Sequence, residues 1–279
     1  MRVAFLCLLL AGPFIPAGVQ KAQAQPSSTP DPDFWWVTDG AVLSILPAGN
    51  VTYIGGTFTY VGPHTGNGAP VDTSSGSTIE PYPQVEGDIY AAVPDGSGGW
   101  FIGGDFTRVG GVARNRLAHI LSDGSVSDFN PDLDSTVRAL ALSGSTLYAG
   151  GYFTTIQGSS GGPYARNRLA AIDTSTSNPT GFNPNLNGIV QALSLSGSIL
   201  YAGGQFTTIQ GSSGGPYARN RLAAIDTTTS NPTPFDPTLG GIVYALALSG
   251  STLYAGGGFT TIQGTSGGPY TRNRLAAID

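Results

Sequence analysis

Cysteine, methionine and lysine are almost absent from this chain of 279 residues. Each occurs once, as Cys7, Met1 and Lys21, and all three lie within the first 24 residues. The remainder therefore has no disulfide, no thiolate nucleophile and no cysteine-based zinc site. His64 and His119 occur in unlike contexts, so neither a histidine metal site nor a Ser-His-Asp triad is indicated. We expect no metal and no cofactor.

Charge is also scarce, and basic charge especially so. Charged residues make up 10% of the chain, with 12 basic against 17 acidic residues. Without Arg2 and Lys21, ten arginines remain and the net charge is −7. A chain this acidic should repel nucleic acid and anionic lipid, so we expect neither as a partner.

Only one long apolar stretch occurs, and it lies at the N-terminus. Arg2 precedes Val3–Ile15, and Ala22-Gln23-Ala24 follows, which is the pattern of a secretory signal peptide. No later stretch approaches the roughly 20 apolar residues of a membrane-spanning helix. We therefore predict a signal peptide at 1–24, a linker at 25–31 and no membrane insertion. The mature protein is expected to be secreted, as an extracellular, cell-surface or periplasmic protein.

One phrase, aromatic-x-Gly-Gly-x-Phe-Thr, recurs along the whole chain. Its copies begin at Tyr53, Phe101, Tyr148, Tyr201 and Tyr254. Their first glycines are spaced 48, 47, 53 and 53 residues apart. Repeats of this length made of short strands are typical of propeller blades. We predict an all-β fold, a β-propeller over 32–279 with repeats of about 47–53 residues.

The repeat beginning at Val137 illustrates the four strands expected in each blade. Strands A, B and C are predicted at 137–142, 146–150 and 167–173, and a short strand D at 181–184. Strands A and C are almost continuously apolar, which suits sheets covered on both faces. Helix signals are absent.

The ends of the chain suggest that the ring closes. Pro32-Asp33-Phe34-Trp35-Trp36 occupies the place of a strand D, while Asp279 ends a strand C. The N-terminal segment would then complete the last of five four-stranded blades, which removes exposed strand edges. The alternative is a fragment of a longer array.

Three phrases, Tyr-x-Gly-Gly-x-Phe, Arg-Asn-Arg-Leu-Ala-Ala-Ile-Asp and Phe-Asn-Pro, resemble the bacterial delta-60-type β-propeller repeats of exported proteins. The first repeat departs from the pattern, since Ala69-Pro70-Val71-Asp72 replaces Arg-Asn-Arg-Leu. The resemblance implies a bacterial origin, a fold and an export route, and carries no catalytic residues.

Two residue columns vary among otherwise similar repeats. The column at the start of strand A reads Leu43, Tyr90, Arg138, Gln191 and Tyr244. The column at the end of strand B reads Thr57, Asp105, Tyr152, Gln205 and Gly258. Both are expected near one mouth of the central channel, where such variety favours a ligand surface. Drift at unconstrained positions is the alternative.

The loops between strands B and C in the last three repeats carry a shared Gly-rich insertion, and shared insertions often map to a binding face. Each presents a tyrosine, Tyr164, Tyr217 or Tyr270, flexibly mounted beside a glutamine. Aromatic faces with nearby amides suit sugar rings. Alternatively, each tyrosine fixes its own loop. The recurrent Arg-Asn-Arg phrase is interpreted as scaffold that bonds loop carbonyls or an aspartate such as Asp173 or Asp226.

A column of carboxylates suggests an enzyme as the second reading. Asp39, Glu86 and Asp134 precede strand A in the first three repeats and would supply the acid and the base or nucleophile of a glycoside hydrolase. Asp is also a preferred turn residue, which is the structural alternative.

The sequence therefore favours a secreted, monomeric binding or structural module that presents one variable face to a glycan or an extracellular protein. A purely architectural role in a surface layer is not separated from this reading by the sequence.

Overall fold

The computed structural model describes residues 36–38, 41–48, 51–57, 61–63, 67–72, 74–76, 78–79, 82–264 and 267–279. The chain divides into two compact units, Met1–Gly62 and Pro63–Asp279. No helix occurs among the described residues, and every regular element is a strand. The predicted all-β class is confirmed.

The first unit contains two strand pairs. A hairpin is formed by β2 (Val42–Ala48) and β3 (Val51–Gly56), which we call blade 1. A second pair joins β1 (Trp36–Thr38) to β4 (Val61–Pro63). Trp36 therefore belongs to a pair with β4, while Phe34 and Trp35 lie outside the described residues. Their predicted contact with Asn273–Asp279 stays a prediction.

Four blades follow in the second unit, each an antiparallel sheet of an inner, a middle and an outer strand. Blade 2 has β6 (Ile89–Pro94), β7 (Trp100–Gly104) and β10 (Leu117–Ile120); blade 3 has β11 (Val137–Ser143), β12 (Thr146–Gly151) and β15 (Leu169–Asp173); blade 4 has β16 (Val190–Ser196), β17 (Ile199–Gly204) and β20 (Leu222–Asp226); blade 5 has β22 (Val243–Ser249), β23 (Thr252–Gly257) and β26 (Leu275–Ile278).

Short strands form a second small sheet beside each blade, from the segment before the inner strand and the loop between middle and outer strands. They are β5 (Val85–Glu86), β8 (Arg108–Val109) and β9 (Val112–Ala113); β13 (Thr155–Ile156) and β14 (Tyr164–Ala165); β18 (Thr208–Ile209) and β19 (Tyr217–Ala218); and β21 (Thr238–Leu239), β24 (Thr261–Gly264) and β25 (Gly267–Thr271).

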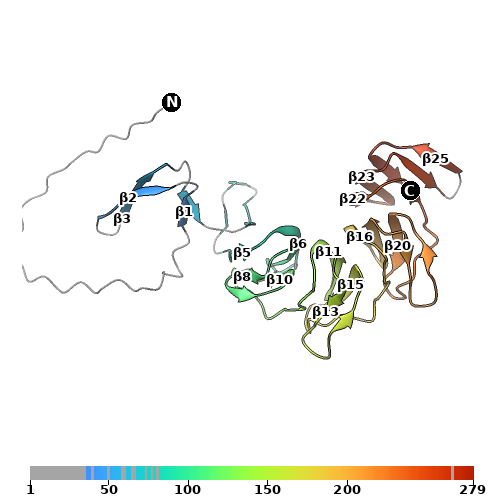
Figure 1. Ribbon diagram of the computed structural model, residues 1–279, viewed down its shortest axis with the longest axis horizontal. Coiled ribbons are helices and arrows are strands. Elements are labelled where there is room, and N and C mark those ends of the chain that lie inside the picture. Colours follow the sequence, from blue (N-terminus) through green and yellow to red (C-terminus); the bar gives the residue numbers. More distant parts are fainter. Residues whose placement is uncertain are drawn as a thin grey trace, which may run out of the picture. The chain divides into compact units, whose positions relative to one another are not determined.

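The blades of the second unit stand side by side, with β6, β11, β16 and β22 following one another along the concave side (Figure 1). Strands A, B and C are thus confirmed. Strand D is wrong as predicted: residues 181–184 form no strand, and the outer strand meets the next segment only at one bridge, Ile172 to Pro179.

Within the second unit, each pair of neighbouring blades shares one apolar core. Val190 of blade 4 is fully buried against Gly150 of blade 3, where an added Cβ would lie 2.6 Å from the Val190 Cγ1 atom. The second glycine, Gly151, passes so close to the Thr136 carbonyl that a Cβ would lie 2.1 Å from its oxygen. The double glycine therefore lets neighbouring blades interlock and lets the inner and middle strands of one blade approach each other closely.

Blade 5 differs because one of its faces is uncovered in the second unit. Tyr254 is 43% exposed, whereas its equivalent in blade 3, Tyr148, is 7% exposed and packs edge-on against Phe182 at 5.5 Å. Leu275 is 65% exposed, whereas Leu169 and Leu222 are fully buried. These residues have the composition of an interblade core, so the face is built to be covered.

Candidate functional site

A β-bulge lies at the start of every inner strand, and the variable column occupies it. The pairing register shifts between Val137 and Ala139, so Arg138 has no partner in the ladder. The same shift leaves the equivalent residues unpaired in the other blades: Leu43, Tyr90, Gln191 and Tyr244. Bulges re-aim side chains and are common beside binding sites. We call Tyr90, Arg138, Gln191 and Tyr244, with Asp105, Tyr152 and Gln205 at the ends of the middle strands, the rim.

Arg138 lies between two aromatic rings. Its guanidinium carbon is 4.0 Å from the ring centre of Tyr90 in blade 2 and 5.5 Å from that of Tyr152 in its own blade. Both distances are within cation–π range. The structure therefore brings together three residues that the sequence predicted as ligand-binding.

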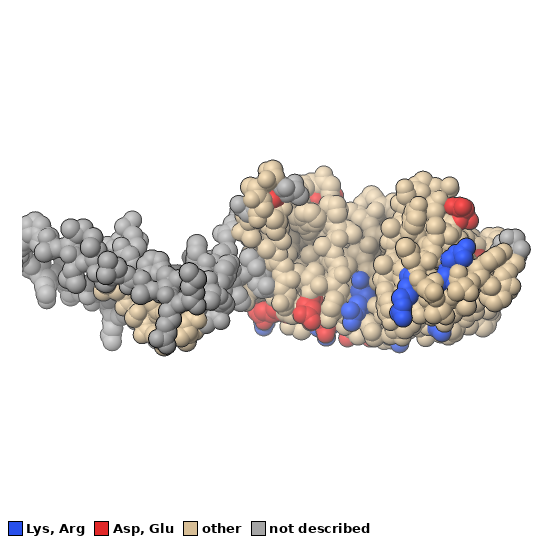
Figure 2. Space-filling model, turned by 90° about the horizontal axis from the view of Figure 1, so that it is seen from above, with Lys and Arg blue, Asp and Glu red and all other residues tan. Residues whose placement is uncertain are grey.

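The blade 2 part of the rim is acidic. The Tyr90 hydroxyl donates to Asp88 at 3.0 Å, and this bond is the main reason that the pKa of Tyr90 is raised. Asp105 pairs with Arg116, Nε to Oδ1, at 3.3 Å. Seen from above the arc, charged groups are sparse, and most of those in view follow one edge, acidic groups at one end and arginines further along (Figure 2).

The blade 4 and blade 5 parts are uncharged. Gln191 and Gln205 are half-buried, and their side-chain amides make no hydrogen bond in the part of the chain that the structure describes. Tyr244 is 56% exposed, and its Cε2 atom lies 3.8 Å from where a Cβ of Gly258 would be. Because Gly258 has no side chain, the Tyr244 ring is left open as a flat apolar surface.

The tyrosines of the Gly-rich loops are tied to their own loops. The Tyr164 hydroxyl donates to the Ser160 carbonyl, and its ring lies against Gly158. Arg166 and Arg272 approach the rings of Tyr164 and Tyr270 at 5.9 Å. The expectation of a flexible mounting is therefore wrong for Tyr164. Ligand binding by Tyr164, Tyr217 and Tyr270 stays a prediction.

Of the three carboxylates that suggested an enzyme, Asp134 is the one whose hydrogen bonds the structure defines. Asp39 lies outside the described residues, and Glu86 is an exposed residue of β5. Asp134 Oδ1 accepts the backbone N–H groups of Thr154 and Thr155 at 2.8 and 3.1 Å. Burial raises the pKa of Asp134, but these hydrogen bonds outweigh it and hold the pKa below its usual value. A carboxyl group held ionised in this way is not suited to act as a general acid.

Replacing Asp134 with Asn should change little. In blade 4 the same place is taken by Asn187, whose Oδ1 accepts the N–H groups of Thr207 and Thr208 at 2.9 and 3.0 Å. We expect Asp134→Asn to lower the free energy of unfolding by about 1 kcal/mol or less. Urea titration checks the stability, and a polysaccharide hydrolysis assay checks activity. Loss of a hydrolytic activity by orders of magnitude would instead support the enzyme reading.

The Arg-Asn-Arg phrase acts as scaffold. In blades 2, 3 and 4 the first arginine of the phrase donates to a carbonyl of the segment after the outer strand: Arg114 to Ser127, Arg166 to Thr180 and Arg219 to Thr233, at 2.7–2.8 Å. The second arginine has a left-handed backbone at Arg116, Arg168, Arg221 and Arg274. The predicted bonding to loop carbonyls is confirmed, but the aspartates that pair are Asp105, with Arg116, and Asp236, with Arg219, both at 3.3 Å. Asp173 and Asp226 instead accept hydrogen bonds within their own turns.

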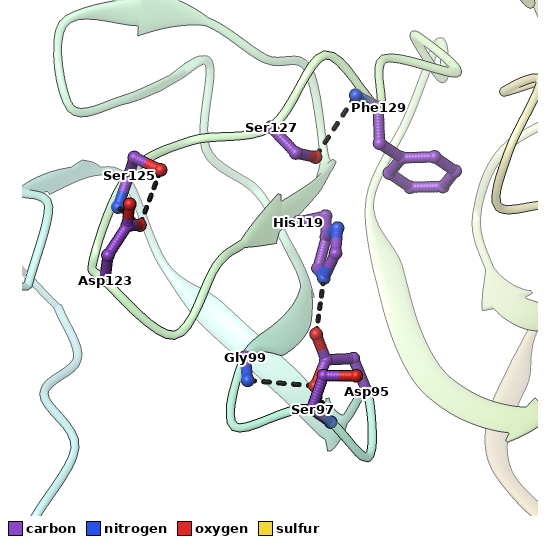
Figure 3. Close-up of polar contacts among 8 residues, drawn as sticks. All are labelled: Asp95, Ser97, Gly99, His119, Asp123, Ser125, Ser127 and Phe129. Atoms are coloured by element: carbon purple, nitrogen blue, oxygen red, sulfur yellow. Dashed lines mark hydrogen bonds and ion pairs between the residues drawn. The ribbon is translucent and has the colours of Figure 1, made fainter.

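A polar pair in blade 2 escaped the sequence reasoning. His119 Nε2 lies 3.0 Å from Asp95 Oδ2 (Figure 3). The ring centre of His119 lies 4.1 Å from that of Phe101, on which it stacks. Asp95 Oδ1 accepts the N–H groups of Ser97 and Gly99 at 2.6 and 2.9 Å. The positions equivalent to His119 are alanine in the later blades: Ala171, Ala224 and Ala277. The sequence signal that could have revealed this pair is a histidine at a position where the later repeats have alanine, together with a longer turn between β6 and β7.

Neither a metal-binding cluster nor a membrane-spanning helix is found among the described residues. They hold no group of three or more His, Cys, Asp or Glu side chains placed to bind a metal ion. None of their elements is a helix with the length and apolar character needed to cross a membrane.

Comparison with known proteins gives no family: no family model and no curated protein matches the chain. Among solved structures it is similar to the computationally designed Ika4 protein, with a TM-score of 0.41 and 14% identity over 69% of this chain and 91% of that one. It is also similar to the WD40 β-propeller domain of Doa1 (TM-score 0.42, 12% identity, 61% of this chain and 48% of that one). The chain is similar as well to the WD40 domain of Neurospora crassa Pan2, with a TM-score of 0.44 and 10% identity over 80% of this chain and 62% of that one. The chain thus spans less than two thirds of either WD40 chain, and its own repeats and blade packing are what identify it as a β-propeller.

Proposed function

We propose that the chain is a secreted, monomeric binding module of a bacterial exterior, which presents the rim to a glycan or an extracellular protein. The observation that carries this proposal is the Tyr90–Arg138–Tyr152 cluster, formed by bulge and strand-end residues at one mouth of the row of blades. Repeats that are otherwise nearly identical differ at these positions, whereas scaffold positions such as the arginines are kept.

A glycan is the favoured partner. An exposed tyrosine ring and unpartnered amides provide an apolar face and hydrogen-bonding groups, which match the C–H patches and hydroxyls of a sugar. Binding sites commonly combine apolar surface with a few polar groups in this way. No contact of the described residues favours hydrolysis over binding, because the one defined carboxylate of the proposed catalytic column caps a turn.

The test is a glycan array probed with the wild-type protein and three variant sets. In the first set Tyr90, Arg138 and Tyr244 become Ser; in the second Tyr164, Tyr217 and Tyr270 become Phe; in the third the Ser-Gly turns at 143–144, 196–197 and 249–250 become Gly-Gly. We expect only the first set to lose binding while it keeps its melting temperature. Normal binding by the first set would contradict the assignment of the rim.

We also propose that the propeller has five blades and that the N-terminal segment covers the free face of blade 5. Phe34 lies outside the described residues, but by repeat position it is the equivalent of Phe182 and Phe235, which pack on Tyr148 and Tyr201. Tyr254 is the next tyrosine of that series and has no such phenylalanine. A covered face also leaves no strand edge for another chain to pair with, which favours a monomer.

A further inference from the structure

Arg138 differs from the scaffold arginines in what surrounds it. Arg116, Arg168 and Arg221 each donate to a backbone carbonyl of the preceding strand end. Within the described ranges, the Arg138 guanidinium has no hydrogen-bond acceptor and no carboxylate in bonding distance; its buried Nε has no partner, as in several of the scaffold arginines. Its only interactions there are with the two aromatic rings. A cation that is held in place and lacks a counter-ion is suited to bind an anionic ligand.

The two rings hold the guanidinium in an orientation suited to this. Stacking uses the faces of the planar group and leaves its in-plane N–H donors, which match a carboxylate in bidentate geometry. The Tyr90 ring is itself fixed by its hydrogen bond to Asp88. Because the side chain is already ordered, binding sacrifices less conformational entropy than it would at a free surface arginine.

The neighbours of Arg138 restrict how much charge the ligand carries. On one side lie Asp88 and Asp105, which repel a second carboxylate. On the other side lie the amides of Gln191 and Gln205, and beyond them the open ring of Tyr244. The rim therefore offers one cationic position, followed by neutral hydrogen-bonding groups and an apolar surface. A uniformly charged polyanion does not fit this order, whereas a mostly neutral chain with spaced carboxylates does.

We propose that the rim binds a polysaccharide in which uronic acids are separated by neutral sugars, with one carboxylate on Arg138 and a neutral sugar ring on Tyr244. This inference rests on the proposed binding function and names its ligand class. Since β11 and β22 are two blades apart, and sheets pack about 10 Å apart, the ligand spans up to about 20 Å. An oligosaccharide, rather than a single sugar, is required to reach both positions.

The test compares acidic and neutral forms of one ligand. Calorimetry is performed with an oligosaccharide of eight sugars in which glucuronate alternates with N-acetylglucosamine, and with the same oligosaccharide after reduction of its carboxyl groups. The variant is Arg138→Gln, which places in blade 3 the residue that blade 4 carries as Gln191. Arg166→Gln is the control, because it removes an equal charge from the same blade at a scaffold position. An array of uronate-bearing and neutral glycans accompanies this measurement.

We expect Arg138→Gln to weaken binding of the acidic form at least tenfold, and to leave any binding of the reduced form unchanged. Wild-type binding of the acidic form should weaken with added salt, since an ion pair is screened. Equal binding of both forms, or array binding confined to neutral glycans, would overturn the uronate assignment and leave the glycan-binding function intact. If no glycan of either kind binds, the proposed function with a glycan partner fails as well. Selective binding of a polyglutamate peptide would overturn the assignment in favour of a protein partner.

Discussion

Gly203→Ala is expected to destabilise the propeller by about 1–3 kcal/mol, the range for an overfilled core. A Cβ at this position would lie 2.6 Å from Cγ1 and 3.1 Å from Cβ of Val243, which is fully buried in the next blade. Neither blade can move aside without opening the core that they share, because protein interiors are closely packed. Urea unfolding followed by circular dichroism measures the change.

Gly256→Ala is the matched variant, since Gly256 is the same position in blade 5. Among the described residues, a Cβ there would have only Ala245 and Arg274 within 4 Å, at 3.8 and 3.9 Å. If the ring is closed, the valine that follows the N-terminal segment, Val42, seats on Gly256 as Val243 seats on Gly203. Gly256→Ala should then cost as much as Gly203→Ala. If blade 5 stays uncovered, the substitution is neutral or stabilises by up to about 1 kcal/mol, because alanine restricts the unfolded chain.

Closure predicts that Gly256→Ala lowers the free energy of unfolding, whereas an uncovered blade 5 predicts no change or an increase. The pair of variants therefore decides the five-blade proposal. A stable Gly256→Ala beside a destabilised Gly203→Ala would contradict closure by the N-terminal segment. Phe34→Ala adds an independent test. Closure predicts a loss of about 3–5 kcal/mol, the usual cost of truncating a buried phenylalanine, whereas an exposed Phe34 predicts almost none.

The sequence predicted the blades well because their signals are local. A Gly-Gly pair ends each middle strand, and turn residues separate the strands, so strands A to C were located to within two residues in the repeat that begins at Val137. Strand D failed because the apolar Phe182 reads as a strand residue, yet it serves as the ring that packs on Tyr148 in the preceding blade. One residue's burial between blades does not distinguish a strand from an extended loop.

The candidate site was predicted only as a list of residues. The columns of Arg138 and Tyr152 were visible as variation between repeats, but the bulge that frees Arg138 from the ladder depends on register, which no alternation pattern reveals. The tie between Tyr164 and Ser160 also depends on a loop conformation that composition does not specify. His119 was passed over because a lone histidine has no fixed partner spacing, and Asp95 is 24 residues away.

The second large effect is expected at the Asp95–His119 pair, where a substitution should lower the free energy of unfolding. Burial raises the pKa of Asp95, but the hydrogen bonds from His119, Ser97 and Gly99 outweigh it and hold the pKa below its usual value. A carboxylate with a lowered pKa stabilises the folded state above its unfolded pKa of about 4, and this stabilisation is lost as the pH falls through the folded value. We therefore expect Asp95→Asn to lower the free energy of unfolding by about 1–3 kcal/mol at pH 7, as for hydrogen bonds to a charged group.

The difference between wild type and Asp95→Asn should begin to shrink as the pH falls below about 4, where Asp95 of the unfolded chain becomes protonated, and should shrink further as the pH falls through the lower pKa of the folded protein. Asp123→Asn is the control in the neighbouring turn (Figure 3), because Asp123 is exposed and bonds only to Ser125. His119→Ala should reproduce part of the loss at pH 7, since it removes both the bond to Asp95 and the stacking on Phe101. Chemical denaturation at pH 7, 5 and 3 measures all three variants. Equal losses for Asp95→Asn and Asp123→Asn, or a gap at pH 3 as large as the gap at pH 7, would show that the partly buried pair does not stabilise blade 2 through its charge.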